Sequence, residues 1–136
     1  MIENLHDKYI IHRKINPNSF HINCDLNNTG NRLYLNHFDL CKEFMSGSSH
    51  HHIPFSVNQL LIGIPQYNSI NAHQYKELSR RDDLESFGNV LVYIHNGILP
   101  WQNIHSFHSI KHLYQMVSEC KSQIITNNYR MSSRVI

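Results

Sequence analysis

Two segments in the second half of the chain carry hydrophobic residues at helical spacing. The first follows Ser79, a residue type that caps helices, has Asp82 and Asp83 in its first turn, and ends at Gly97. Its apolar positions surround the helix almost completely: Leu84, Phe87, Val90, Leu91, Val92 and Ile94. A helix that is apolar nearly all round predicts a central helix over about 80–96, buried inside the domain.

The second segment runs from Ile110 to Ile124 and has a narrower apolar face. Its apolar residues at amphipathic spacing are Ile110, Leu113, Tyr114, Val117 and Ile124. This spacing predicts a helix that packs on the domain with one face only. Trp101 follows Pro100 and is expected to anchor the turn between the two helices.

The first half of the chain contains one short strand pattern. Residues 31–38 are rich in β-forming residues, and residues 19–23 are expected to pair with them across the turn-forming run DLNNTG at 25–30. Residues 46–68 show no sustained period and predict a long loop. The predicted fold class is therefore mainly α with a small β-hairpin.

Composition narrows the class of protein. The chain has 136 residues, 40% hydrophobic and 16% charged, which fits one globular domain. A net charge of +2 is too small to predict nucleic-acid binding. Cys24, Cys41 and Cys120 form no CxxC pair, which favours a reducing compartment over a disulfide framework. No signal peptide and no apolar run near about 20 residues is present. We expect a soluble intracellular domain, in cytoplasm or nucleus, without nucleic-acid or membrane partners.

Five motifs follow one another along the chain. They are HRKINPNSF at 12–20, HFDL at 37–40, SINAH at 69–73, SRRDDLESFG at 79–88 and LPWQ at 99–102. In sequence and order they closely resemble the C-terminal lobe of casein kinase I, a family of Ser/Thr protein kinases. The resemblance covers roughly residues 4–121. SRRDDLES, together with SIN in place of the A-P-E of most protein kinases, is specific to that family.

The resemblance implies a protein-kinase-like fold limited to the C-terminal lobe, with residues 1–136 as a truncated, partial kinase domain. The N-terminal lobe, with its Gly-rich loop, has no counterpart in the sequence, and neither do the last helices of the C-terminal lobe. We therefore expect the central helix to expose apolar surface. The implied parts are a catalytic loop at 10–20, a strand pair within 19–38, an activation segment at about 39–67, the central helix at about 80–96 and the following helix at about 110–122.

Phosphoryl transfer requires a carboxylate that orients the attacking hydroxyl and oxygen ligands for Mg²⁺. The resemblance aligns the family's catalytic Asp with Lys14, its metal-binding Asn with Ser19, and its metal-binding Asp with His37. Charged lysine cannot accept a proton, and imidazole nitrogen suits transition metals better than Mg²⁺. Two more family residues, a Lys and a Gly, align with Asn16 and Asp39. No catalytic position is intact, so we expect no ATP or Mg²⁺ to be used, although the family uses both.

The resemblance also implies structural roles. Asp83 is expected to hydrogen-bond the loop backbone around His12 and Arg13, and His12 is expected to act in packing. Gln59 and Gln66 align with the Lys and Arg that hold a substrate's phosphate in the family. Neutral amides bind anions more weakly than charged groups do, so we expect this anion pocket to be lost.

The run His50–His52 invites a metal or pH-sensor interpretation. Zinc sites need converging ligands at defined spacing, and three consecutive histidines in a loop do not provide this. A solvated loop is the preferred interpretation, and no metal site is predicted.

Three hypotheses remain for the function. The chain is an inactive pseudokinase fragment that binds or regulates a protein partner, for example a kinase, or it is a degenerate gene product without function. The alternative is an active Ser/Thr protein kinase that transfers phosphate from ATP to proteins. Lys14, Ser19 and His37 oppose this alternative because each removes a group that the chemistry needs.

Overall fold

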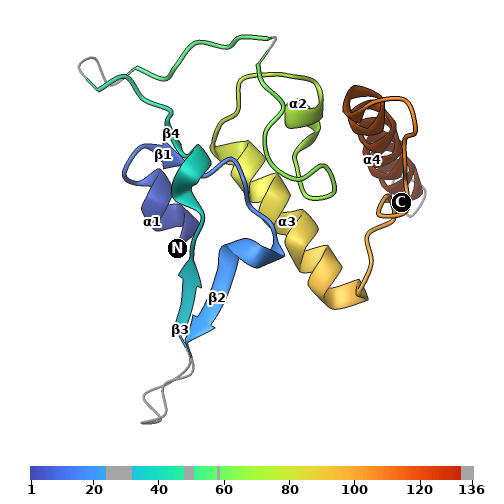
Figure 1. Cartoon of the computed structure of the whole chain (residues 1–136), viewed down its shortest axis with the longest axis horizontal. Coiled ribbons are helices and arrows are strands. Elements are labelled where there is room, and N and C mark those ends of the chain that lie inside the picture. The colour runs from blue at the N-terminus through green and yellow to red at the C-terminus, as the bar shows by residue number, and fades with distance from the viewer. Residues whose placement is uncertain (24–31, 48–50, 58, 133–136) are drawn as a thin grey trace.

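The computed structural model describes residues 1–23, 32–47, 51–57 and 59–132, with side chains up to residue 124. The helices of these ranges are α1 (Ile2–His6), α2 (Ile70–His73), α3 (Arg80–Asn96) and α4 (Ile110–Ser132). The strands are β1 (Ile10–Ile11), β2 (Phe20–Asn23), β3 (Arg32–Leu35) and β4 (Lys42–Glu43). In Figure 1, α3 lies between α1 and the hairpin on one side and α2 and α4 on the other.

The strands form two separate antiparallel pairs, β1 with β4 and β2 with β3. The predicted hairpin is confirmed, with Phe20 opposite Leu35 and Asn23 opposite Arg32. Its second strand is shorter than predicted because His37 adopts a left-handed conformation (φ 64°) and Phe38–Leu40 form a 3₁₀ turn. The predicted turn at 25–30 and Cys24 lie outside the described residues, whereas Cys41 and Cys120 are free thiols.

The bounds predicted for α3 are confirmed, but its predicted all-round burial is wrong. Asp82 accepts a hydrogen bond from the Ser79 amide at 2.7 Å, and Gly97 ends the helix with φ 74°. Val90 is buried because α1 and the loop before the hairpin pack on its side of the helix. The exposed apolar side chains of α3, between 40% and 68% exposed, are Leu84, Leu91, Val92 and Ile94. Apolar exposure on this helix agrees with the expectation drawn from the resemblance.

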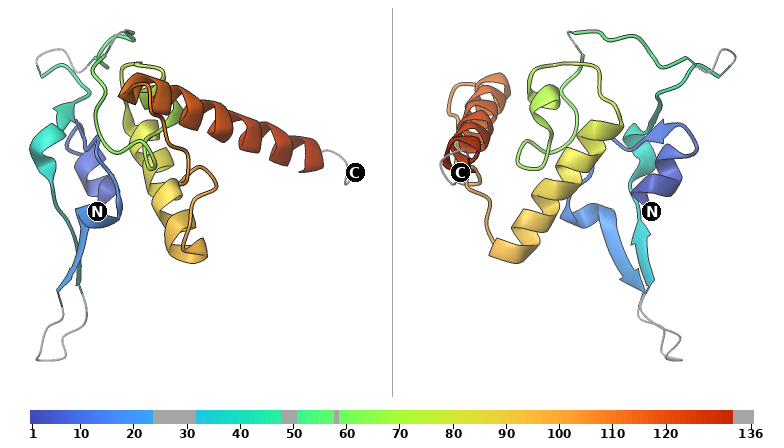
Figure 2. Two further views of the ribbon diagram at one scale, coloured as in Figure 1. Left: turned by 45° about the vertical axis from the view of Figure 1, so that its right-hand side comes forward. Right: turned by 180° about the vertical axis from the view of Figure 1, so that it is seen from behind.

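The second predicted helix is present as α4 and continues beyond its expected end to Ser132. Residues 110–132 contain neither Gly nor Pro, so no residue interrupts the helix. Figure 2 shows the C-terminal half of α4 extending away from the other elements. Tyr114 and Val117 are buried as predicted, but Ile110 is 69% exposed and is not among the residues of the cluster that docks α4, whose first member on this helix is Leu113.

The long predicted loop contains no helix or strand in its described parts, 46–47, 51–57 and 59–68. An isolated bridge joins Met45 to His52. The short helix α2 follows, capped by the Ser69 hydroxyl, which accepts a hydrogen bond from the Ala72 amide. The strand and helix patterns did not predict α2, which spans only Ile70–His73. No helix in the described part of the chain is long and apolar enough to cross a membrane.

Three small hydrophobic clusters hold the elements together. The first joins β1 and β4 to α2 through Ile11, Phe44, Ala72 and Leu78. The second joins α1, the loop after β1 and α3 through Ile2, Ile15 and Val90. The third docks α4 through Leu99, Trp101 and Val117. Ile11 of the first cluster and Ile15 of the second cluster flank residues 12–14. This loop therefore lies between the two clusters.

Candidate functional site

The loop at 12–20 is fixed to the first turn of α3 by one buried carboxylate. Asp83 is 2% exposed and accepts hydrogen bonds from the amides of His12, at 2.7 Å, and Arg13, at 2.8 Å. His6 Nε2 lies 2.9 Å from the same carboxylate. Arg13 has φ 64°, a conformation that costs free energy for a residue with a side chain. The paired amides offset this cost, and the bonds are those that the resemblance implied.

Three consecutive residues of the loop contact the segment 36–40. The His12 ring nitrogen Nε2 lies 2.8 Å from the Asn36 carbonyl, and its ring packs edge-on against Phe38. Arg13 Nε donates to the carbonyl of Leu40 at 2.6 Å. His12 is fully buried, and this packing leaves it no access to solvent. The loop and the turn after β3 are therefore held as one unit.

The third contact joins two of the aligned catalytic positions. Lys14 Nζ donates to Asp39 Oδ2 at 3.0 Å, and the side chains are 30% and 56% exposed. The hydrogen bond from Lys14 lowers the pKa of Asp39 below its ordinary value of 3.8, so the carboxylate is charged at neutral pH. Lys14 offers a cation and a hydrogen-bond donor at the position that the resemblance aligns with the catalytic acid, and Asp39 is paired with it.

Asn16 and Ser19 hold the loop's own backbone. Asn16 Nδ2 donates to the Lys14 carbonyl at 2.8 Å, and Ser19 Oγ donates to the same carbonyl at 2.9 Å. Asn16 Oδ1 accepts from the Asn18 amide at 3.0 Å. Both side chains are buried, Ser19 completely. The Ser19 hydroxyl is therefore bonded inside the loop.

His37 is exposed, and its ring lies near that of His21, with ring centroids 6.3 Å apart. Among the residues that the structure describes, no group of three or more His, Cys, Asp or Glu side chains could hold a metal ion. Of the histidine run, His52 Nδ1 lies 2.7 Å from the Ile53 carbonyl, and His50 lies outside the described residues. The arrangement of the whole histidine run therefore stays outside what the described residues show.

Gln59 and Gln66 lie in different places. Gln59 lines a cavity together with Arg13, Lys76 and Glu77. The backbone carbonyl of Gln66 accepts a hydrogen bond from the Trp101 indole at 2.7 Å, and Gln66 is not among the residues that line this cavity. The cavity contains both signs of charge, because the Glu77 carboxylate, which pairs with Lys42 at 2.9 Å, also faces it.

Two of the motifs form one hydrogen-bond network. Asp82 on α3 accepts from the Ser69 hydroxyl at 2.8 Å and from the Asn71 amide group at 3.0 Å. Glu85, one turn later, accepts from the Ile70 amide at 2.8 Å. The S-I-N residues of α2 are thus bound to the acids of SRRDDLES. Both motifs are recognisable in the sequence, but their contact was not predicted, because neither motif contains a signal for pairing with the other.

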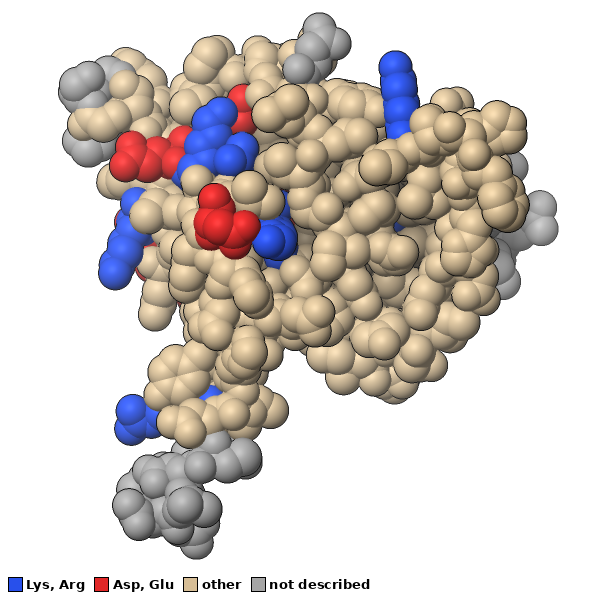
Figure 3. All heavy atoms as spheres, in the orientation of Figure 1, with Lys and Arg blue, Asp and Glu red and all other residues tan. Residues whose placement is uncertain are grey.

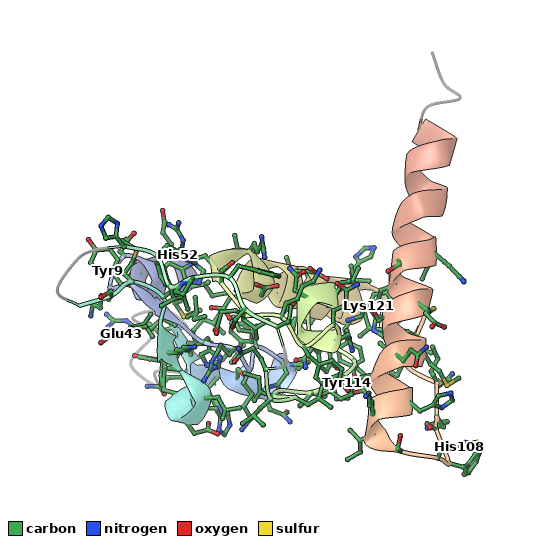
Figure 4. All side chains as sticks on the ribbon, turned by 90° about the horizontal axis from the view of Figure 1, so that it is seen from above. Tyr9, Glu43, His52, His108, Tyr114 and Lys121 are labelled. Carbon is green, nitrogen blue, oxygen red and sulfur yellow. The ribbon has the colours of Figure 1, made fainter. Side chains whose placement is uncertain are left out.

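The sequence pattern also did not identify Lys121 as a buried residue. This lysine lies on the buried side of α4 near Val117 and is only 2% exposed. In Figure 4, which is seen from above, Lys121 is labelled between α2 and α4. Its spacing from Tyr114 and Val117, seven and four residues, placed it on the apolar face. A lysine at such a position is usually assigned to the solvated side, which is why the pattern did not identify it.

No protein-family model matches the chain. The chain is 38% identical over 120 residues to casein kinase I homolog 2 of Schizosaccharomyces pombe. The match includes 88% of this chain and 27% of that relative, so the chain spans about a quarter of the relative's length. The chain belongs to the casein kinase I family.

Proposed function

We propose that the chain is a catalytically inactive member of its family, a pseudokinase module that acts by binding a protein partner. The observation that carries the proposal is the ion pair of Lys14 with Asp39. It stands where phosphoryl transfer requires a free carboxylate close to the substrate hydroxyl. The metal-ligand positions support the same conclusion, because Ser19 is bonded inside its loop and His37 offers nitrogen.

The proposed architecture is the C-terminal lobe of a protein kinase. In this assignment residues 10–20 are the former catalytic loop, about 39–67 the activation segment, α3 the central helix and α4 the helix that follows. The two amides bonded to Asp83 support it, because they orient the loop on α3. The S-I-N contacts with Asp82 support it as well.

Membership in a kinase family favours the alternative, an active Ser/Thr kinase that uses Mg·ATP. The contacts of Lys14, Ser19 and His37 weigh against it together. Loss of a general base alone costs typically about 10²–10⁴-fold in rate, and loss of the metal ligands would add to this. We therefore propose that neither ATP nor Mg²⁺ is used.

A protein partner is favoured by the surface of the molecule. The apolar side chains on α3, Leu91 and Ile94 among them, are exposed. On the face drawn in Figure 3, charges of both signs gather beside α1 and β4, and the part over α4 shows few charges. This face does not gather Lys and Arg side chains into a basic patch of the kind that nucleic acids require. The compartment of the chain is proposed to be cytoplasm or nucleus.

Thermal unfolding of the purified chain, with and without Mg·ATP, tests the proposal. We expect one cooperative transition whose midpoint does not move with nucleotide, because a ligand raises the midpoint only when it binds the folded state. A complete casein kinase I under the same conditions serves as the positive control. A rise of the midpoint with Mg·ATP would contradict the proposal, and the absence of any cooperative transition would favour a degenerate gene product.

A further inference from the structure

Lys121 lies at the interface of α4 with α2 without a carboxylate as an ion-pair partner. Its Nζ donates to the Asn68 carbonyl at 2.5 Å and lies 3.4 Å from His73 Nε2. The same atom lies 4.8 Å from the centroid of the Trp101 ring. None of the ion pairs between described residues includes Lys121. A buried ammonium in such surroundings is poorly compensated for its lost hydration.

The titratable groups that face Lys121 come from three helices. His73 is on α2, Glu85 on α3 and Cys120 on α4 itself. Burial lowers the pKa of His73 to about 3, so its imidazole is neutral and its Nε2 can accept a hydrogen bond. Tyr114 packs edge-on against that imidazole, and burial raises the pKa of its phenol to about 12. The loop before α2 contributes the Asn68 carbonyl, and the loop after α3 contributes the Trp101 indole ring. Neither of these groups titrates.

We propose that the protonation state of Lys121 controls how firmly α4 docks against α2 and Trp101. The uncharged amine favours the docked helix, because it still donates to the Asn68 carbonyl and gives up little hydration. The ammonium favours an undocked helix in which water surrounds it. The apolar contacts of Val117 with Leu99 and Trp101 hold α4 in both cases, so protonation changes the strength of docking.

The direction of the effect follows from proton linkage. Burial lowers the pKa of Lys121 from 10.5 to about 7 in the docked state, and the Glu85 carboxylate opposes this shift in part. Between these values the undocked state binds one more proton, so the docking equilibrium rises by up to about tenfold for each pH unit. Below about 7 both states carry the proton, and Lys121 contributes no pH dependence.

Trp101 reports on the protonation of Lys121 in the docked state, because it is the only tryptophan of the chain and its ring lies under the ammonium. We would record the tryptophan emission of the whole chain from about pH 6 to about pH 10. The expected result is a change with its midpoint near 7 in the wild type and in K111M, a control at an exposed lysine of the same helix. K121M is expected to show no such change, and hydrogen exchange of α4, corrected for intrinsic rates, is expected to slow with rising pH in wild type only.

The same change in K121M as in the wild type would overturn the proposal, because another group would then be responsible. If K121M does not fold, the wild type labelled with ¹⁵N-lysine still provides the test. A lysine Nζ resonance that titrates near 7 supports the proposal, whereas titration of every lysine above about 10 overturns it.

Discussion

Lys14 and Asp39 have opposite charges and lie at two positions that the resemblance aligns with an acid and a glycine of the family. Their charged groups are 3.0 Å apart. We predict that K14D and D39K each lower the midpoint of thermal unfolding, because each places like charges next to each other. The double variant K14D/D39K restores the opposite pair and is expected to unfold closer to the wild-type temperature. Equal midpoints for all four proteins would show that the pair is not formed in solution.

Asp83 is a second residue whose role can be tested alone. The variant D83N keeps the shape of the side chain and removes the negative charge of the carboxylate that accepts hydrogen bonds from the His12 and Arg13 amides. We predict a loss of about 2 kcal/mol or more in the free energy of unfolding, measured with denaturant. D7N, at an exposed aspartate, is the matched control and is expected to change little. If D83N unfolded like D7N, the carboxylate would not orient the loop.

The alignment of Lys14 with the family's catalytic acid stays a prediction drawn from the resemblance. The sequence did not indicate that Lys14 pairs with Asp39, because the two residues are 25 positions apart. The bonds of Ser19 inside its own loop were missed for a different reason. They depend on the turn that Asn16 and Pro17 form, and a ligand alignment does not describe a turn.

At the scale of elements, α2 is held to α3 by the Ser69 hydroxyl, which accepts from the Ala72 amide and donates to Asp82. We predict that S69A lowers the free energy of unfolding by about 1–2 kcal/mol, since it removes a helix cap and leaves a buried carboxylate with one donor fewer. S69T keeps the hydroxyl and is expected to lose less. Equal losses in both variants would indicate that packing, and not the hydroxyl, explains the effect.

The two long helices differ in how far local sequence determines them. The start and end of α3 were predicted because Ser79, Asp82 and Gly97 act within a few residues of each end. The end of α4 was not predicted correctly, because neither Gly nor Pro follows Ile124 within the helix to end it. The exposure of Ile110 and the burial of Lys121 depend on where α4 meets α2, which periodicity cannot specify.

At the scale of the whole molecule, α3 is packed on one side and exposed on the other. We predict that L91S changes the free energy of unfolding by less than about 0.5–1 kcal/mol, because the Leu91 side chain is already half exposed. V90A, at the neighbouring buried position, is expected to lose about 2 kcal/mol through lost burial and a cavity. Denaturant unfolding of both variants gives the comparison. A larger loss in L91S than in V90A would mean that the exposed face is covered in solution.

The central proposal is that this member of a kinase family does not transfer phosphate. It rests on the pairing of Lys14 with Asp39, on the bonds of Ser19 inside its loop, and on His37, which joins no metal-binding group among the described residues. The most direct measurement is transfer of labelled phosphate from Mg·ATP to a phosphate-primed serine peptide, with a complete casein kinase I as the positive control. We predict no transfer above the rate without protein. The contradicting result would be phosphate transfer by the purified chain at a rate that changes when Lys14 or His37 is substituted.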